Sequence, residues 1–189
     1  MPPFEPFPVL ETPRMILRRI VPDDTYEMYV LRSDERVMKY IDRPRSKSQE
    51  DAAAMIQSIE SSILNGELIA WAMCLRDDPR MIGNIGYWRM QLHNFRAEIG
   101  YMLHPDFHRQ GLTSEAIKAV VEFGFENMNL HSIEADINPG NTASARILEK
   151  HQFVREAYYR ENFFFEGTFL DTAVYSLLRS EYRQNTASE

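Results

Sequence analysis

The sequence has little cysteine, no long apolar run and no excess of positive charge, and each shortage excludes a class of protein. Cys74 is the single cysteine among 189 residues, which excludes an internal disulfide framework and a paired-cysteine redox or zinc site. No apolar run approaches about 20 residues, so no segment is expected to span a membrane. The formal charge of −7 argues against a non-specific nucleic-acid binder, because such binding requires neutralisation of phosphates.

Several familiar motifs are missing as well. Neither the GxxxxGK(S/T) phosphate loop nor the GxGxxG fingerprint of dinucleotide-binding oxidoreductases occurs. No two histidines form an HExxH-type pair, so we expect no metal site. The first residues lack a basic segment followed by an apolar stretch, so they do not resemble a signal peptide and a cytoplasmic location is expected.

What the sequence does contain is enough apolar residues for a packed core. Hydrophobic residues make up 44% and charged residues 26% of the chain, as in ordinary globular domains. We therefore expect one domain over residues 11–180, preceded by an extended arm over residues 1–10 and followed by a tail over residues 181–189.

The first half of the chain is predicted to form a strand, two helices and then a run of strands. Residues 15–20 read as a strand, and Asp23 or Asp24 would cap a following helix. Ser48 and Asp51 resemble a capping box for a second helix, which Gly66 would end. An antiparallel meander is predicted to follow, with strands at residues 69–75, 81–90 and 96–103.

The second half alternates strands and helices. A long amphipathic helix is predicted to lead into a strand over residues 131–137, a short helix over residues 141–151 and closing strands over residues 153–159 and 169–178. This order implies a right-handed crossover and parallel pairing. The fold class is therefore mixed α/β, a mostly antiparallel sheet with helices on both faces.

The loop before the long helix carries a pattern suited to an anion. Backbone N–H groups at the start of a helix lack internal partners and carry the positive end of the helix dipole. Gly111 would allow close approach of a pyrophosphate, Arg109 adds a cation, and Thr113 and Ser114 add hydroxyl donors. An ordinary helix start capped by Thr113 or Ser114 explains the same residues equally well.

A set of ordered motifs surrounds this loop, and together they resemble the GNAT superfamily of N-acetyltransferases. The most similar branch is the RimJ/RimL type, which includes ribosomal-protein N-terminal acetyltransferases. The motifs are, in chain order, Thr12–Arg18, AEIGYML at 97–103, HRQGLTSEA at 108–116, Ile133-Glu134-Ala135, NPGNTAS at 138–144 and LEKHQF at 148–153.

The resemblance implies a GNAT fold with a splayed parallel pair of strands. It also implies transfer of an acetyl group from acetyl-CoA to a primary amine, either a protein or peptide N-terminus or a small molecule. A longer acyl donor remains open, as does a non-catalytic module of the same fold that only binds acyl-CoA. A homodimer is also left open.

The resemblance further assigns the site residues. In similar enzymes a bulge in the strand before the loop separates two parallel strands, and pantetheine bonds to the freed backbone. The expected cofactor-binding residues are Tyr101, Met102, Leu103, His108, Arg109, Gln110, Gly111, Leu112, Thr113, Ser114, Asn138, Asn141 and Ser144.

Glu98 is the candidate general base, because the related histone-acetyltransferase branch carries its glutamate base at this place. A surface ion pair with Arg96 or Arg89 is the alternative role. Two positions depart from the family pattern. Leu148 stands where many members have a tyrosine that can act as general acid, and Phe163 stands where the ribosomal enzymes have a glutamate.

The sequence also makes predictions about a hairpin near residue 165 and about the side chains of one strand. Residues 163–167 read as a hairpin that would form either the rim of an acceptor cleft or a dimer contact. On the strand over residues 81–90, alternation predicts that Tyr87 and Arg89 face opposite to Trp88 and Met90.

Overall fold

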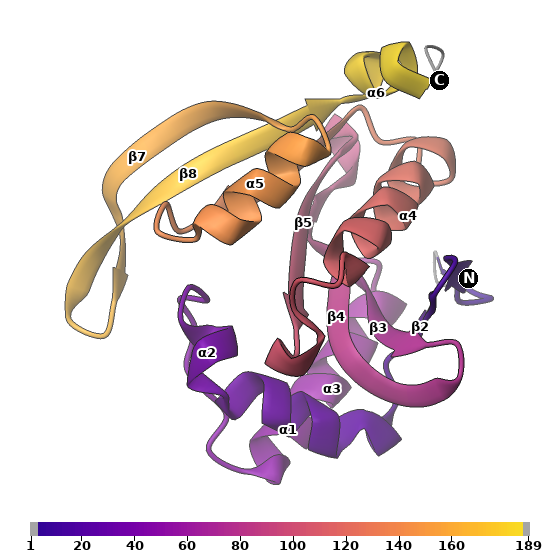
Figure 1. Cartoon of the computed structure of the whole chain (residues 1–189), viewed down its shortest axis with the longest axis vertical. Helices are drawn as coiled ribbons and strands as arrows, with labels where there is room; N and C mark the ends of the chain where they lie inside the picture. Colours follow the sequence, from indigo (N-terminus) through magenta and orange to yellow (C-terminus); the bar gives the residue numbers. More distant parts are fainter. Residues whose placement is uncertain (1–3, 187–189) are drawn as a thin grey trace.

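The computed structural model describes residues 4–186, which form a single mixed sheet flanked by helices (Figure 1). The strands lie in the order β1-β2-β3-β4-β5-β6-β8-β7. Their bounds are β1 Leu10–Glu11, β2 Met15–Arg19, β3 Ile69–Leu75, β4 Asp78–Gln91, β5 Arg96–Leu103, β6 Ser132–Ile137, β7 Val154–Phe165 and β8 Thr168–Leu178. The strands predicted from the sequence are confirmed, although β4 begins earlier and β7 runs further than expected.

Pairing is antiparallel everywhere except between β5 and β6. These two strands are joined through helix α4 (Leu112–Glu126), the crossover that the alternating pattern predicted. The predicted mixed sheet with one parallel pair is therefore confirmed.

The helices flank the sheet on both faces. Helix α3 begins at the predicted capping box, in which the Ser48 side chain accepts from the Asp51 backbone, and Gly66 follows it with φ of 73°. Asp24 occupies the predicted N-cap position of α1, but its carboxylate makes no capping bond there and accepts instead from Arg18 and from the Val21 backbone. Apart from α4, the α-helices have the bounds α1 Thr25–Ser33, α2 Glu35–Met38, α3 Gln49–Leu64, α5 Thr142–Lys150 and α6 Arg179–Thr186.

Helices α2 and α6 were not predicted. The proposed domain limits also fall inside elements, since β1 contains residue 10 and α6 runs from 179 to 186 into the expected tail. Residues 1–3 of the arm and 187–189 of the tail lie outside the described residues. Within residues 4–186, none of the helices has the length and apolar character needed to cross a bilayer.

Two apolar clusters fill the two faces of the sheet, and β3 contributes to both. Its alternate residues Trp71 and Met73 pack on the α4 side, while Ala72 and Cys74 pack on the α1 and α3 side. Cys74 is 2% exposed in this cluster, and burial raises the pKa of its thiol to about 11.

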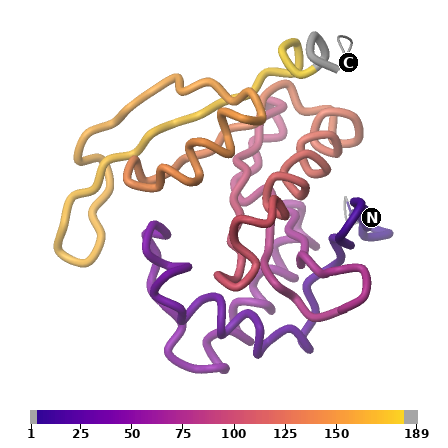
Figure 2. The backbone as a smooth tube through the Cα atoms, viewed as in Figure 1, coloured from indigo at the N-terminus to yellow at the C-terminus, as the bar shows by residue number. Residues whose placement is uncertain are grey.

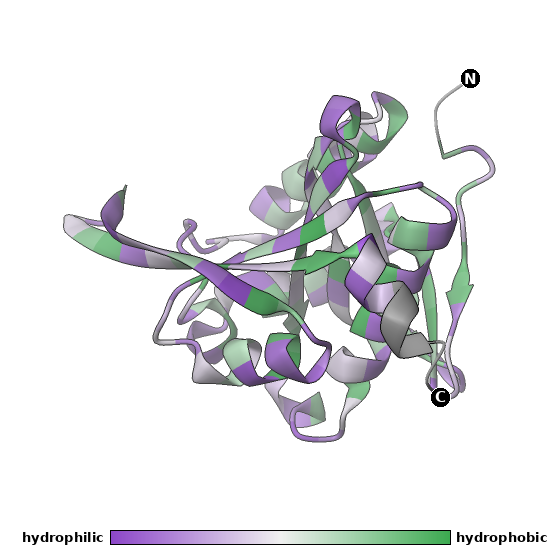
Figure 3. Cartoon of the chain, turned by 90° about the horizontal axis from the view of Figure 1, so that it is seen from above, coloured by the Kyte–Doolittle hydropathy of each residue, from purple (hydrophilic) through white to green (hydrophobic). Residues whose placement is uncertain are grey.

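Strands β7 and β8 form a long hairpin that reaches beyond the body of the sheet, as Figures 1 and 3 show. Figure 2 shows the segment after α2 rising toward this hairpin from the opposite side. The hairpin and the segment after α2 form two walls of a cleft, and β4, β5 and β6 form its floor.

Candidate active site

The sheet opens between its two parallel strands. Strands β5 and β6 pair at three register positions, the last of which joins Glu98 to Glu134. Beyond that point β6 continues to Ile137 alongside β8, whereas the part of β5 from residue 99 to 103 has no pairing with β6. The splayed parallel pair expected from the resemblance is therefore present.

The bulge lies one strand away from its predicted position. The register of β4 against β5 shifts between Tyr87 and Arg89, so Trp88 is the extra residue of β4. The strand before the loop, β5, was expected to carry it. The Trp88 indole donates to the Gly100 carbonyl at 3.0 Å and holds the distorted region in place.

This bulge also overturns the predicted alternation along β4. Trp88 and Arg89 both line the cleft, whereas Tyr87 is fully buried and Met90 packs against the same core cluster as Tyr87. An extra residue in one strand resets which face its side chains occupy, and sequence alternation alone cannot reveal it.

The cleft has a volume of about 660 Å³ and collects many of the predicted site residues. Residues from eight different strands and helices, together with connecting segments, line it. The predicted site residues among them are Glu98, Tyr101, Met102, Asn138, Asn141 and Ser144. Leu103 and the loop from residue 108 to 114 do not line this cleft.

The loop instead presents its backbone at the start of α4. Arg109 and Gly111 both have left-handed backbones, with φ of 59° and 80°, and Gly111 occupies the N-cap position. Within residues 4–186, the backbone N–H groups from Arg109 to Ser114 find no protein acceptor. Consecutive unpaired N–H groups at a helix start suit an anion. The alternative in which Thr113 or Ser114 caps the helix is wrong.

Several loop side chains are already bonded within the protein or buried. The His108 ring donates through Nε2 to the Leu103 carbonyl at 2.9 Å, and the Gln110 amide donates to the Asp106 carbonyl. The Ser114 hydroxyl is bonded to Nε2 of His151 at 2.8 Å. Leu112 is 2% exposed, so its side chain belongs to the core. The binding capacity of this loop therefore resides mainly in its backbone.

An anchor for the loop comes from residues that the sequence did not single out for this role. Arg14 donates to Gln110 O at 2.8 Å and forms an ion pair with Glu115 at 2.7 Å. Thr12 donates to the same carboxylate at 2.6 Å. These contacts join the start of β2 to the start of α4 across about a hundred residues of sequence, a separation that no local pattern reports.

Glu98 lies at the point where β5 and β6 part. Its side chain is 16% exposed and bonds to Nε of Arg89, which also donates through Nη2 to Asp136 at 2.9 Å. The predicted pairing alternative, Arg89 rather than Arg96, is therefore present, while Arg96 pairs with Glu134. Both partners of this ion pair line the cleft, with the Arg89 side chain 59% exposed and the Glu98 side chain 16% exposed.

Two opposing effects act on the pKa of Glu98. Burial raises the pKa of Glu98 above its ordinary 4.5, and Arg89 acts in the opposite direction. The carboxylates of Glu98, Glu134 and Asp136 lie within 4.8 Å of one another and could in principle hold a cation. Arg89 bonds to Glu98 and Asp136, and Arg96 pairs with Glu134.

The opposite wall is formed by the start of α5. Asn141 caps this helix by accepting from the Ser144 backbone at 3.1 Å, and the Ser144 hydroxyl bonds to the Tyr101 hydroxyl at 2.7 Å. Burial raises the pKa of Tyr101 to about 12. Leu148 is fully buried and does not line the cleft, so in this fold its position does not face the candidate reaction centre.

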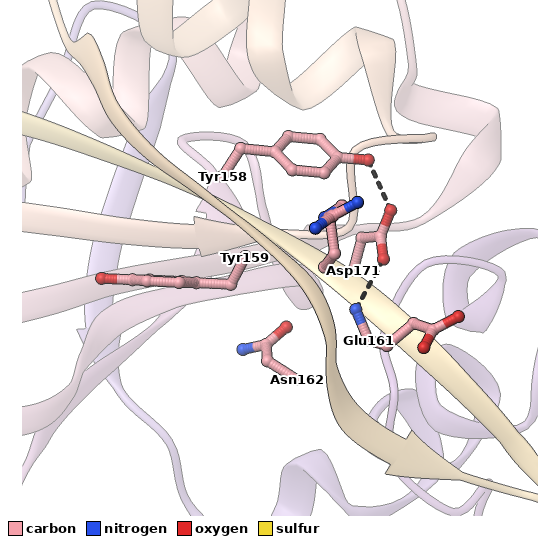
Figure 4. A pocket seen from close by; sticks show the side chains of 6 residues that line it. Tyr158, Tyr159, Glu161, Asn162 and Asp171 are labelled. Atoms are coloured by element: carbon pink, nitrogen blue, oxygen red, sulfur yellow. Dashed lines mark hydrogen bonds between the residues drawn. The ribbon is translucent and has the colours of Figure 1, made fainter.

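The hairpin supplies part of the rim. Phe163 lines the cleft, with the Arg43 guanidinium 5.5 Å from its ring centroid. Glu161 does not line the cleft. It borders a separate hollow on β7 and β8, where its backbone donates to Asp171 and Tyr158 donates to the same carboxylate (Figure 4).

Comparison with known proteins decides the family. Residues 14–154 match the family described as acetyltransferase (GNAT) domain. The chain belongs to the GNAT acetyltransferase family. It is 36% identical to the uncharacterized N-acetyltransferase YoaA of Bacillus subtilis (strain 168), over 92% of this chain and 98% of that protein.

Other relatives agree with this family assignment. A GNAT-family acetyltransferase from Bacillus anthracis superposes with a TM-score of 0.82 at 26% identity, covering 92% of this chain and 100% of that one. The RimL ribosomal alpha-N-protein acetyltransferase in complex with coenzyme A superposes with a TM-score of 0.83 at 18% identity. The match covers 92% of this chain and 99% of that one and shows a shared fold. The ribosomal-protein-serine acetyltransferase of Escherichia coli (strain K12) is 23% identical over 69% of this chain and 72% of its own. The resemblance to the RimJ/RimL-type branch is confirmed.

Proposed function

We propose that this GNAT protein transfers an acetyl group from acetyl-CoA to a primary amine by direct attack. The observation that carries the proposal is the separation of β5 from β6 immediately after Glu98. An unpaired strand edge can bond to the amide groups of pantetheine in the manner of an added strand. The same strand leads through residues 104–111 to the N–H groups at the start of α4.

The proposed donor fits both features. The N–H groups from Arg109 to Ser114 would bind the pyrophosphate, and the edge of β5 at Tyr101 and Met102 would guide pantetheine toward the cleft. Asn141 and Ser144 would border the arm from the α5 side. The thioester would then lie beside Glu98, at the junction of the two strands.

Glu98 is the proposed general base for the acceptor. An ammonium ion cannot attack a thioester, so the amine must first lose a proton. Glu98 would take that proton directly or through one water. The nitrogen–carbon bond then forms and the carbon–sulfur bond breaks. The extra proton on the acylated nitrogen passes to the departing sulfur, so CoA leaves as the thiol. A backbone N–H near Met102 or Leu103 would stabilise the negative charge on the thioester oxygen.

The donor half of the proposal is tested by calorimetry with acetyl-CoA on Gly111→Glu. An added Cβ would meet only Nη2 of Arg14, at 3.5 Å, so space permits the side chain while the left-handed backbone strains it. The new carboxylate would repel the pyrophosphate, and binding is expected to be abolished. Unchanged affinity would remove the pyrophosphate site.

The transfer half is tested by release of free CoA with a panel of primary amines. Turnover on at least one amine is expected. Tight acetyl-CoA binding without turnover on any amine would instead favour a non-catalytic acyl-CoA-binding module. A matched propionyl-CoA series tests the donor, because a shorter chain should give the higher kcat/KM if acetyl is the preferred group.

A further inference from the structure

The cleft has a second polar end, away from the strand junction. Arg32 in the last turn of α1 and Arg43 in the segment after α2 both line the cleft, together with Asp42. These residues lie outside the motifs that carry the family resemblance from Ala97 onward. They belong to the wall that faces the β7–β8 hairpin, where an acceptor would enter.

Arg32 is a buried cation without an acidic partner. Its residue is 6% exposed, and its Nη2 donates to the Pro44 carbonyl at 2.9 Å. Its Nε is buried and finds no acceptor among residues 4–186, and no carboxylate of those residues forms an ion pair with it. Burial lowers the pKa of Arg32, and the nearby Arg43 lowers it further. An arginine nevertheless keeps its charge, so this residue of the cleft lining carries a cation with an unused donor.

The charged groups that line the cleft divide into two ends. At the strand junction one guanidinium, Arg89, lies between the two carboxylates of Glu98 and Asp136, and Oδ1 of Asp136 is buried without a partner among the described residues. That end is therefore short of one positive charge.

At the other end, Arg32 and Arg43 stand against Asp42 alone. Burial raises the pKa of Asp42, while Asn138 and Arg43 act in the opposite direction. This end is therefore short of one negative charge. An unused acceptor on Asp136 and an unused donor on Arg32 thus belong to residues that line the same cavity.

We propose that the acceptor is an amine that also carries a carboxylate. Its amine lies beside Glu98 and Asp136, and its carboxylate is bound by Arg32, with Arg43 at the rim. The inference rests on the proposed function and names the substrate class of that site. A guanidinium binds a carboxylate through charge-assisted hydrogen bonds, which would satisfy the unused Nε. A polyamine would bring a second cation against Arg32 and is disfavoured.

The carboxylate has two sources, a free amino acid or the acidic side chain of a peptide. Acceptor pairs that differ only in this group distinguish them: an amino acid against its carboxamide, and a peptide with aspartate at its second position against the same peptide with asparagine. In one of the two series the acidic member is expected to show a kcat/KM at least about 10-fold higher, as for a hydrogen bond to a charged group.

The matched variants are Arg32→Met and Arg36→Met. Arg32→Met should reduce the acid-to-amide ratio to about one, mainly through a higher KM for the acidic acceptor. Arg36 lies on α2, outside the cleft and paired with Asp34, so its variant should retain the wild-type ratio. Removing an unpaired buried charge should not lower Tm, and Arg32→Lys provides a second variant that keeps the charge but loses the planar fork.

The outcomes separate the two proposals. Equal kcat/KM for both members of every pair, or an unchanged ratio in Arg32→Met, would overturn the carboxylate inference while leaving amine acetylation intact. No acetylation of any member, with acetyl-CoA binding retained, would remove the proposed function and the inference together. A ratio above about 10 that depends on Arg32 alone supports the inference.

Discussion

Replacing Glu98 by glutamine tests the proposed base with little change of shape. The side chain is 16% exposed and lies where β5 leaves β6, so a neutral amide would occupy the same space without accepting the amine proton. A positioned general base contributes about 10²–10⁴-fold to the rate. We expect kcat to fall by about 10²–10³-fold, with the acetyl-CoA dissociation constant changed by less than about twofold.

The pH profile provides a second readout of the same substitution. Burial raises the pKa of Glu98 above 4.5, with Arg89 opposing. The base works when deprotonated, so kcat/KM should rise with pH through a midpoint above 4.5, and this limb should vanish in the variant. Because the folded pKa is raised, the stability that Glu98 contributes is present below about pH 4.5 and is lost as pH rises through the folded pKa.

Glu134→Gln is the matched control, since Glu134 stands in register with Glu98 on β6, pairs with Arg96 and does not line the cleft. Steady-state release of CoA and calorimetry with acetyl-CoA would measure both variants. A fully active Glu98→Gln, or an equal loss in Glu134→Gln, would refute the assignment of the base.

Three further substitutions test the surrounding structure. Asn141→Ala removes the cap that accepts from the Ser144 backbone and should lower stability by about 1 kcal/mol, or Tm by about 2–4 °C. It should also weaken acetyl-CoA binding by about 1–2 kcal/mol. An unaltered dissociation constant would show that Asn141 is a helix cap alone. Leu148→Tyr should destabilise the fully buried site by about 1–3 kcal/mol without raising turnover, measured by calorimetry and CoA release, and a more active variant would contradict that. Burial lowers the pKa of His151 below 6.5, so its contribution to stability is lost as pH falls below about 6.5. His151→Gln should therefore flatten the fall in Tm between about pH 7.5 and pH 5.5. An unchanged slope would exclude this contribution.

Much of the candidate site could be placed from the sequence because its signals are local. The motif residues on β5 and at the starts of α4 and α5 fall where the resemblance put them, and Glu98 does lie at the opening of the parallel pair. The sequence does not show the partners of the loop side chains. His108 bonds to the Leu103 carbonyl and Ser114 to the His151 ring, because the fold brings these groups together.

The sequence by itself determined the element types, since periodicity, the Ser48 capping box and Gly66 act within a few residues of chain. It also determined the loop whose backbone can bind an anion. Only the tertiary structure decided where the bulge lies, because one extra residue at Trp88 is defined by the partner strand.

The charge arrangement of the cleft was likewise decided by the fold. Arg89 joins Glu98 to Asp136 from three different strands, and Arg32 is left without an acidic partner among the described residues. Such pairings depend on which distant residues meet and which remain unmatched. A sequence records the residue types but not these distances, so the charge that an acceptor must supply becomes visible only after folding.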